Sequence, residues 1–281
     1  MRMLVVDAFT DRPFAGNPAG VCLPPGAADP EWMRRVAAEM KHSETAFVRS
    51  VEDAAGGSGG SSPRDGAADF ELRWFTPVME VALCGHATMA AAHALYETGV
   101  VASGRPIRFR TLKSGVLTVT RDGTGRLSMD FPACPAEPAD VPAGLADALG
   151  VTVAAVGRNV QNDLIVEVED EAAVRKVAPD TRALAEIDAR GVIVTAVGAG
   201  RGHDFVSRFF APRVLPGDGE DPVTGSAHCA LAPHWARRLG RDTLTGYQAS
   251  ARGGYVHVAL RGDRVVLSGT AVTVLDADLR V

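Results

Sequence analysis

The sequence predicts an α+β protein of two similar domains, each a curved, mostly antiparallel, barrel-like sheet wrapped around a central helix. The first observation is a repeat. Residues 75–95 (FTPVMEVALCGHATMAAAHAL) and 210–235 (FAPRVLPGDGEDPVTGSAHCALAPHW) share Phe-x-Pro, a loop, a glycine and an alanine-rich helix. Second, the helix in the first copy is apolar around most of its circumference, which is typical of a buried helix. Third, strand signals flank both helices.

In the first half, Asp29-Pro30 opens a helix that runs to about residue 41, because proline is tolerated in the first turn of a helix. The Gly- and Ser-rich stretch at 53–68 is expected to be a flexible loop at the tip of a hairpin. The alanine-rich helix follows Gly85. Segments with β-branched, aromatic or alternating residues predict strands at 3–9, 18–23, 43–49, 70–75, 107–111, 115–121 and 126–131.

The second half has the same kind of organisation. Helices are predicted at 171–177 and 227–239, and a helix onset at Pro142. Strands are predicted at 164–168, 192–196, 205–210, 255–260, 264–268 and 272–275. We expect an N-terminal domain of residues 1–118 and a C-terminal domain of residues 119–269, with a last strand near 270–281 that returns to the first domain. No Gly-x-Gly-x-x-Gly follows a strand, so a dinucleotide-binding fold has no support.

Composition excludes several classes of protein. The chain has 281 residues, 46% hydrophobic and 22% charged, as is ordinary for a globular protein, and that length suits two domains. The net charge of −5 argues against a nucleic-acid partner. No apolar run approaches the roughly 20 residues that a membrane helix needs, and the N-terminus does not read as a signal peptide. We therefore expect a cytoplasmic protein with neither a nucleic-acid nor a membrane partner.

The cysteines are scattered, with no Cys-x-x-Cys pair, so neither a zinc site nor any other metal site is expected. In a cytosolic chain they should be reduced. Small buried hydrophobic side chains are the ordinary interpretation for three of them, whereas Cys84 adjoins the repeated turn. The four are Cys22, Cys84, Cys134 and Cys229.

Two residues of the first half are candidates for acid–base chemistry. Glu44 stands at the start of the strand predicted at 43–49. A carboxylate that faces an apolar cleft has a raised pKa and can act as general acid or base; the alternative is a solvated glutamate at a strand edge. His86 follows Gly85 at a helix N-terminus, where the positive end of the helix dipole favours a neutral imidazole. The alternative for His86 is a helix cap.

The second half offers Asp221 and Ser226, in the sequence DPVTGS. Asp221 could hydrogen-bond a partner such as His86 or act as a second acid–base group, or it could simply begin a turn. Ser226 could cap the helix or offer its hydroxyl to a ligand. No Gly-x-Ser-x-Gly is present, so a serine nucleophile is weakly supported. Asn17, in Gly-Asn-Pro, could bind a substrate carboxylate or belong to an ordinary turn.

The two glycines, Gly85 and Gly225, place two helix N-termini after similar turns. Each can present free backbone N–H groups to an anionic ligand. If the halves face each other, the active site lies in the cleft between the domains.

Several strings together resemble the phenazine biosynthesis PhzF-like family: VDAFTDRPFAGNPAGV, SETAFV, FTPVMEVALCGHAT, EDPVTGSAHCAL and the tail SARGGYVHV…LSGTAVTVL. The resemblance covers nearly the whole chain, in the family's order. It implies the diaminopimelate epimerase-like fold, a homodimer, no cofactor and a small anionic metabolite as substrate. The phenazine enzyme isomerises a dihydro-hydroxyanthranilate through a glutamate that moves a proton between carbons.

By the same resemblance, that glutamate falls on Glu44, and the supporting residues fall on His86, Asp221 and Ser226, with backbone amides beside Gly85 and Gly225. The function this implies is a cofactor-independent isomerase that moves a proton between carbons of a small carboxylate-bearing metabolite.

Racemases and epimerases of the same fold use two thiols, each beside one of the two glycine turns. Cys84 occupies the first position, but Ala227 stands at the second, and Cys229 lies two residues further on. A two-thiol racemase is therefore disfavoured. A racemase or epimerase that uses Cys84, and a non-catalytic metabolite-binding or protein-interaction dimer, remain as alternatives. The sequence does not identify the substrate.

Overall fold

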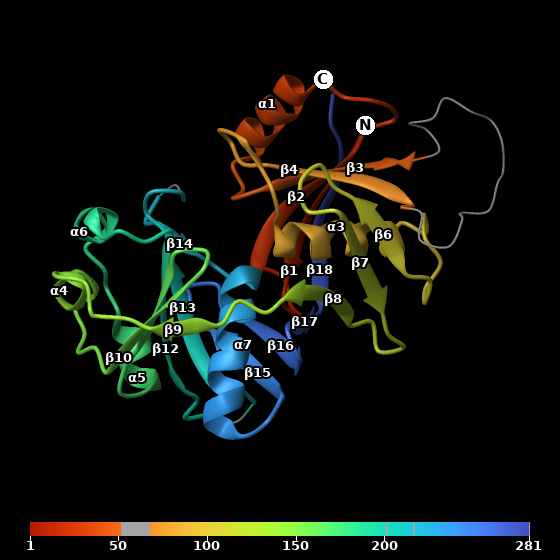
Figure 1. The fold of residues 1–281 in the computed structure, drawn as a ribbon. Helices are drawn as coiled ribbons and strands as arrows, with labels where there is room; N and C mark the ends of the chain where they lie inside the picture. The colour runs from red at the N-terminus through yellow and green to blue at the C-terminus, as the bar shows by residue number, and fades with distance from the viewer. Residues whose placement is uncertain (52–67, 201, 216, 281) are drawn as a thin grey trace. The chain divides into compact units, whose positions relative to one another are not determined.

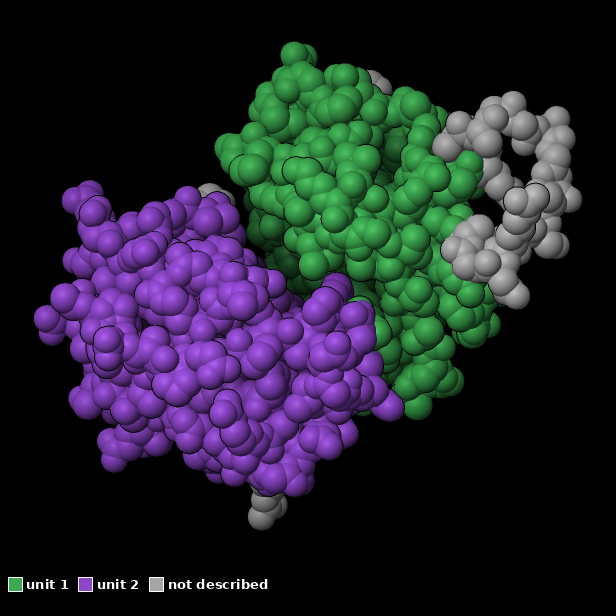
Figure 2. Space-filling model, viewed as in Figure 1, with its two compact units in different colours: residues 1–130, 268–281 green, residues 131–267 purple. Residues whose placement is uncertain are grey.

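The computed structural model describes residues 1–51, 68–200, 202–215 and 217–280. The loop expected at 53–68 lies outside the described residues except for its last position. Contacts between Cα atoms divide the chain into two compact units (Figures 1 and 2). Unit 1 comprises Met1–Asp130 and Ser268–Val281, and unit 2 comprises Phe131–Leu267. Among the described residues, no helix combines the length and apolarity needed to cross a membrane.

Unit 1 is built on a mostly antiparallel sheet. Strand β1 lies between β18 and β2 and is antiparallel to both. The β2–β3 and β4–β6 pairs are parallel, and β3–β4, β4–β5, β6–β7 and β7–β8 are antiparallel. The strands are β1 (Arg2–Ala8), β2 (Asn17–Leu23), β3 (Thr45–Ser50), β4 (Phe70–Phe75), β5 (Glu80–Val81), β6 (Ile107–Arg110), β7 (Val116–Arg121), β8 (Leu127–Pro132) and β18 (Ala271–Asp278).

The helix α3 (Gly85–Glu97) is the core of unit 1. Ten of its thirteen residues are buried, and it packs against β1, β2, β3 and β18. A helix that is apolar on every side needs cover on every side, and the curved sheet supplies it. The second helix, α1 (Pro30–Met40), has Asp29 as its N-cap and packs against β3 and β4.

Unit 2 repeats this plan. Strand β12 is parallel to β11 and antiparallel to β13, and β13 is parallel to β15, so the pairings of β2–β3–β4–β6 in unit 1 recur. The strands are β9 (Ala136–Pro138), β10 (Ala155–Asn159), β11 (Asp163–Glu167), β12 (Gly191–Val197), β13 (Phe205–Phe210), β14 (Glu220–Asp221), β15 (Thr243–Gln248), β16 (Gly254–Arg261) and β17 (Arg264–Gly269).

The central helix of unit 2 is α7 (Gly225–Leu239), which packs against β15 and β16. The remaining helices are α4 (Leu145–Leu149), α5 (Glu171–Lys176) and α6 (Thr181–Glu186). Apolar residues of β10–β13 and of these three helices form one core cluster. Strands β9, β10, β14 and β15 and helix α6, and strand β5 of unit 1, were not among the expected elements.

The limits of the units differ from the expected domain limits of 118 and 269. Strand β7 contains residue 118 and pairs with both β6 and β8, so contacts hold this meander in unit 1 as far as Asp130. The last strand, β18, pairs along its length with β1, and the second limit falls before Ser268.

Candidate active site

The first repeated turn leaves the sheet at the end of β4 and is held by its own side chains. Arg73 donates two hydrogen bonds to Glu80, from Nε to Oε1 at 2.7 Å and from Nη2 to Oε2 at 2.8 Å. The Thr76 hydroxyl accepts from the amides of Val78 and Met79. These contacts fix the chain that leads from the sheet into α3.

Helix α3 begins at Gly85, as the sequence predicts, and Cys84 is its N-cap residue. The Cys84 side chain makes no capping hydrogen bond, and its carbonyl accepts from the amide of Thr88 at 3.1 Å. The first amides of an α-helix have no carbonyl partner within the helix and carry partial positive charge. The amides of Gly85 and His86 therefore favour negative charge beside them.

The imidazole of His86 is the centre of a buried polar cluster. Its Nδ1 lies 3.2 Å from Nδ2 of Asn17 and 3.5 Å from Sγ of Cys84. Its Nε2 lies 3.4 Å from Oε2 of Glu44 and 3.5 Å from the Ser43 hydroxyl. Three of the residues singled out from the sequence, Asn17, Glu44 and His86, thus meet within unit 1.

Asn17 holds the His86 ring from the first residue of β2 and is fully buried. The chain reaches this position through Gly16, whose φ is +65° and where a Cβ atom would lie 2.1 Å from the carbonyl oxygen of Ala8. With the Asn17 amide nitrogen toward Nδ1, the ring proton is on Nε2 and faces Glu44. Asn17 therefore holds the histidine ring, and the end of its amide that faces Nδ1 decides which ring nitrogen carries the proton.

Glu44 directly precedes β3, and its side chain is 15% exposed. Burial raises the pKa of Glu44, and hydrogen bonds from Ser43 and Cys84 act in the opposite direction. A carboxyl group in such surroundings exchanges its proton closer to neutral pH than an exposed glutamate does. The structure thus places Glu44 inside unit 1 and not at a solvated strand edge.

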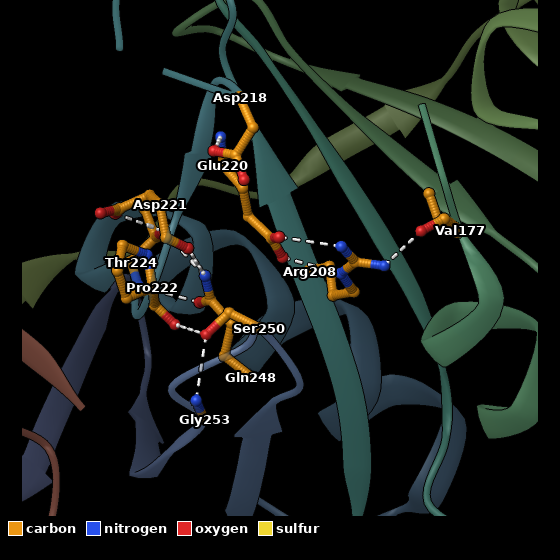
Figure 3. Close-up of polar contacts among 10 residues, drawn as sticks. All are labelled: Val177, Arg208, Asp218, Glu220, Asp221, Pro222, Thr224, Gln248, Ser250 and Gly253. Atoms are coloured by element: carbon orange, nitrogen blue, oxygen red, sulfur yellow. Dashed lines mark hydrogen bonds and ion pairs between the residues drawn. The ribbon is translucent and has the colours of Figure 1, made fainter. Parts of the chain in front are cut away.

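The second repeated turn has the same frame (Figure 3). Arg208 on β13 donates to Glu220 on β14, again from Nε to Oε1 at 2.7 Å and from Nη2 to Oε2 at 2.8 Å. Arg208 Nη1 also donates to the carbonyl of Val177 at 2.5 Å. Strand β14 pairs with β13 as β5 pairs with β4. The longer loop of the second copy is accommodated between β13 and β14.

Asp221 is buried at the end of this turn. Its Oδ2 accepts from the Thr224 hydroxyl at 2.6 Å. The fully buried Gln248 bridges the two ends of the turn, accepting from the Thr224 amide at 2.8 Å and donating to the Asp221 carbonyl at 2.7 Å (Figure 3). Ser250 donates to the carbonyl of Pro222. The Asp-Pro pair thus forms a turn whose position is fixed by side chains from β15 and beyond.

Helix α7 begins at Gly225 as predicted, but its N-cap is Thr224 and not Ser226. Ser226 is the second helical residue, and its hydroxyl lies 3.4 Å from Nη2 of Arg190. Arg190 in turn is paired with the fully buried carboxylate of Asp163. The expectation that Ser226 caps the helix is therefore wrong, while its hydroxyl remains beside a cation.

Several of these contacts have no signal in the sequence. Ser43 belongs to the same string as Glu44 but carries no signal of its own, and Arg190 belongs to no motif. Gln248 stands 24 residues beyond Thr224, in a strand that was not expected. A repeated Arg-x-Phe-x-Pro followed by a Glu five residues before the helix glycine could have revealed the two ion pairs.

The four cysteines are reduced and buried. Cys84 alone among them lies in the His86 cluster, whereas Cys229 is in α7, where its carbonyl accepts from the amide of Cys134. Ala227, where a second thiol would stand in a two-thiol racemase, is buried in α7. The two turns therefore differ chemically although their frames are alike.

Comparison with known proteins gives a consistent result. The family model of phenazine biosynthesis-like proteins matches residues 6–277. An uncharacterized isomerase of Halalkalibacterium halodurans is 44% identical over 276 residues, covering 98% of this chain and 97% of the relative. The crystal structure of a phenazine biosynthesis protein of the PhzF family from Enterococcus faecalis has a TM-score of 0.86 at 36% identity, with 99% of each chain covered.

A more distant structure, a probable proline racemase from Agrobacterium radiobacter K84, has a TM-score of 0.62 at 14% identity and covers 99% of this chain and 92% of that one. At this identity the likeness concerns the fold alone. It agrees with the predicted fold, in which two similar α+β domains each enclose a helix, and that prediction is confirmed.

Proposed function

The chain belongs to the family of phenazine biosynthesis-like proteins, and from this premise we propose that it is a cofactor-independent isomerase that moves a proton between carbons of a small carboxylate-bearing metabolite. It is an enzyme of the isomerase class. The observation that carries the proposed mechanism is the contact of the largely buried Glu44 carboxyl with the His86 ring at 3.4 Å.

Glu44 is proposed as the general acid–base group. As a carboxylate it removes a proton from a carbon next to a conjugated system, and as a carboxylic acid it returns that proton to a different carbon. The carbon–hydrogen bond breaks with its electron pair left on the substrate, and the new bond forms with that pair. One base suffices if the substrate remains bound and water is excluded.

His86 is proposed to support Glu44 in both protonation states. With Nδ1 held by Asn17, Nε2–H donates toward the Glu44 carboxylate, which restrains that carboxylate. Rotation of the Asn17 amide would reverse the two roles of the ring. Asn17 acts through His86 in this scheme and is a positioning residue, where the sequence had suggested a direct contact with substrate.

The helix N-termini are proposed to stabilise the negative charge that develops on the substrate. The amides at Gly85 and Gly225 lie at the starts of α3 and α7, where partial positive charge accumulates. Asp221 and Ser226 are proposed, from the family resemblance, to orient the substrate or relay protons. A homodimer and a cytoplasmic location are also proposed; light scattering in solution tests the first.

A second candidate is a racemase or epimerase that uses the Cys84 thiol. It is favoured by one observation: Cys84 donates a hydrogen bond to Glu44 and lies 3.5 Å from Nδ1 of His86. A non-catalytic metabolite-binding dimer is the third. The isomerase should lose turnover when Glu44 is replaced, and the racemase or epimerase when Cys84 is replaced. The non-catalytic dimer should bind a metabolite without turning it over.

The test uses a panel of carboxylate metabolites that carry an acidic carbon–hydrogen bond, incubated with the protein in heavy water. Isomer formation is followed by NMR and deuterium content by mass spectrometry. For an accepted compound we expect Glu44→Gln to slow turnover by about 100-fold or more, while Cys84→Ala and the surface control Glu31→Gln remain active. Equal turnover by Glu44→Gln and wild type would falsify the mechanism. Loss of turnover in Cys84→Ala but not in Glu44→Gln would favour the racemase or epimerase. Binding of a metabolite without turnover would favour the non-catalytic dimer.

A further inference from the structure

The cluster around His86 contains three side chains that are ordinary metal ligands. Each of Glu44, Cys84 and His86 offers one ligand atom, and these atoms all lie within 4.8 Å of one another. They provide an oxygen, a sulfur and an aromatic nitrogen. Among the described residues, Glu44, Cys84 and His86 are the group of three potential metal ligands whose ligand atoms lie within this distance of one another.

The spacing between Glu44 and His86 suits a tetrahedral ion. Zinc bonds of about 2.0–2.2 Å to oxygen and nitrogen and about 2.3 Å to sulfur imply donor–donor distances of roughly 3.3–3.6 Å in a tetrahedron. The distance from Glu44 Oε2 to His86 Nε2 is 3.4 Å. Cys84 Sγ lies 4.0 Å from His86 Nε2 and 3.5 Å from Nδ1, so rotation of the Cys84 side chain toward the Nε2 edge of the ring is needed to complete the site.

The charges also match. A zinc ion bound by the Glu44 carboxylate, the Cys84 thiolate and a neutral His86 has no net charge, which is what a buried site requires. In the metal-free protein the Cys84 thiol donates to Glu44, so the ion replaces that shared proton, which leaves to solvent. The side chains of Glu44 and His86 are 15% and 6% exposed, and Cys84 is 7% exposed.

The surroundings supply the partner that a ligating histidine needs. Metal-bound histidines usually hydrogen-bond through their second ring nitrogen, which fixes the ring. With a metal on Nε2, Nδ1 carries the proton, and the Asn17 amide at 3.2 Å accepts it through its oxygen after a rotation of the amide. The Ser43 hydroxyl also lies close to this nitrogen, at 3.5 Å from Nε2.

We propose that Glu44, Cys84 and His86 form a zinc(II) site with three protein ligands and an open fourth position, and that occupancy by zinc inhibits the enzyme. Thiolate, imidazole and carboxylate together favour zinc over magnesium or calcium, which prefer oxygen ligands. The inhibitory part rests on the proposed function, because the ion occupies the carboxylate that is proposed to move the proton. The site itself does not depend on that function.

The experiment uses the purified chain, freed of metal with a chelator and titrated with cobalt(II) as a spectroscopic substitute for zinc. One equivalent should produce the visible absorption of tetrahedral cobalt and a thiolate-to-cobalt charge-transfer band, and zinc should displace both. Cys84→Ala should lose the charge-transfer band, and Glu44→Gln and His86→Ala should weaken binding at least tenfold. Cys134→Ala, a matched change of a buried cysteine outside the cluster, should keep the wild-type spectrum.

An octahedral cobalt spectrum without the charge-transfer band, or an unchanged spectrum in Cys84→Ala, overturns the proposal. The thermal midpoint of each variant shows that it is folded, and if His86→Ala does not fold, His86→Gln replaces it. Zinc should also inhibit turnover of wild type but not of Cys84→Ala. If the charge-transfer band forms but Glu44→Gln turns over as fast as wild type, the metal site stands and the proposed function is wrong. If turnover depends on Glu44 but the band does not form, the proposed function stands and the metal site is wrong.

Discussion

Arg73 and Glu80 form a two-point ion pair across the turn that leads into α3, with N–O distances of 2.7 and 2.8 Å. Unit 2 repeats this relationship with the same atoms and the same distances between β13 and β14. In both units the guanidinium also lies over a phenylalanine ring two residues further along the strand. The pairs hold the short strand that precedes each helix glycine, so they position the helix N-termini of the proposed site.

Replacing Glu220 by Gln should lower the free energy of unfolding by about 3 kcal/mol, because it leaves the guanidinium of Arg208 without its carboxylate in a nearly buried site. The side chains of Arg208 and Glu220 are only 13% and 11% exposed. Urea unfolding measures the change. Glu80→Gln should cost less, since Arg73 and Glu80 are 22% and 25% exposed.

The matched control for this prediction is Glu31→Gln. Glu31 also pairs with an arginine, Arg34, through two hydrogen bonds, but both side chains are exposed on α1. Exposed pairs contribute little to stability, so the urea midpoint should stay close to that of wild type. Equal shifts for Glu31→Gln and Glu220→Gln would contradict the argument that burial makes the second pair important.

Gly16→Ala should destabilise the protein and disturb the His86 cluster. The φ of +65° at Gly16 is unfavourable for alanine, and the added Cβ would lie 2.1 Å from the Ala8 carbonyl oxygen. We expect a loss of about 2 kcal/mol or more, together with a shift of the His86 ring signals in NMR, because Asn17 follows directly. Gly26→Ala is the control: nothing lies within 4 Å of its added Cβ. A stable Gly16→Ala protein with unshifted His86 signals would contradict this.

The sequence was sufficient for the features that depend on local pattern. Glycine after Phe-x-Pro marks where α3 and α7 begin, and the apolar circumference of α3 predicts its burial. These follow from backbone freedom and hydrophobic periodicity, which a short window of sequence contains. The family strings then point to Glu44 and His86 although the two residues are 42 positions apart.

Other parts of the site could not be predicted because they depend on the closing of the sheet. Ser43 approaches His86 only when the chain before β3 packs against α3, whereas Cys84 lies beside His86 because it caps the same helix. Gln248 reaches the second turn from β15, and nothing near it in the sequence signals a role. Scattered cysteines argued against a metal site, yet the fold brings Glu44 from a distant position to Cys84 and His86, which are neighbours in the sequence.

Gln248→Ala should destabilise unit 2 by about 3 kcal/mol, because it leaves the amide of Thr224 and the carbonyl of Asp221 buried without this partner. Gln248→Glu keeps the acceptor for the Thr224 amide but places an oxygen against the Asp221 carbonyl, so it should not restore stability. Gln161→Ala removes an exposed glutamine as the matched control. Urea midpoints of the three variants provide the test; a wild-type midpoint for Gln248→Ala would show that the bridge does not hold the turn.

His228 should make stability fall in mild acid. Burial lowers the pKa of its imidazole to about 4, and its Nδ1 donates to the Thr224 carbonyl at 2.8 Å. Between pH 6.5 and pH 4 the unfolded chain binds a proton at this residue that the folded chain does not, so stability decreases as the pH falls through this window. From pH 7 to pH 5 the loss due to His228 should be about 2 kcal/mol.

Other groups also titrate in acid, so the comparison is between wild type and His228→Leu. The free energy of unfolding of the leucine variant should decrease by about 2 kcal/mol less than that of wild type between pH 7 and pH 5. An NMR titration of the wild-type imidazole gives the same information without a substitution: the ring should remain neutral at pH 5. Identical pH dependence of the two proteins, or an imidazole that titrates near pH 6.5, would show that His228 is accessible to protons and that burial at the start of α7 does not control its charge.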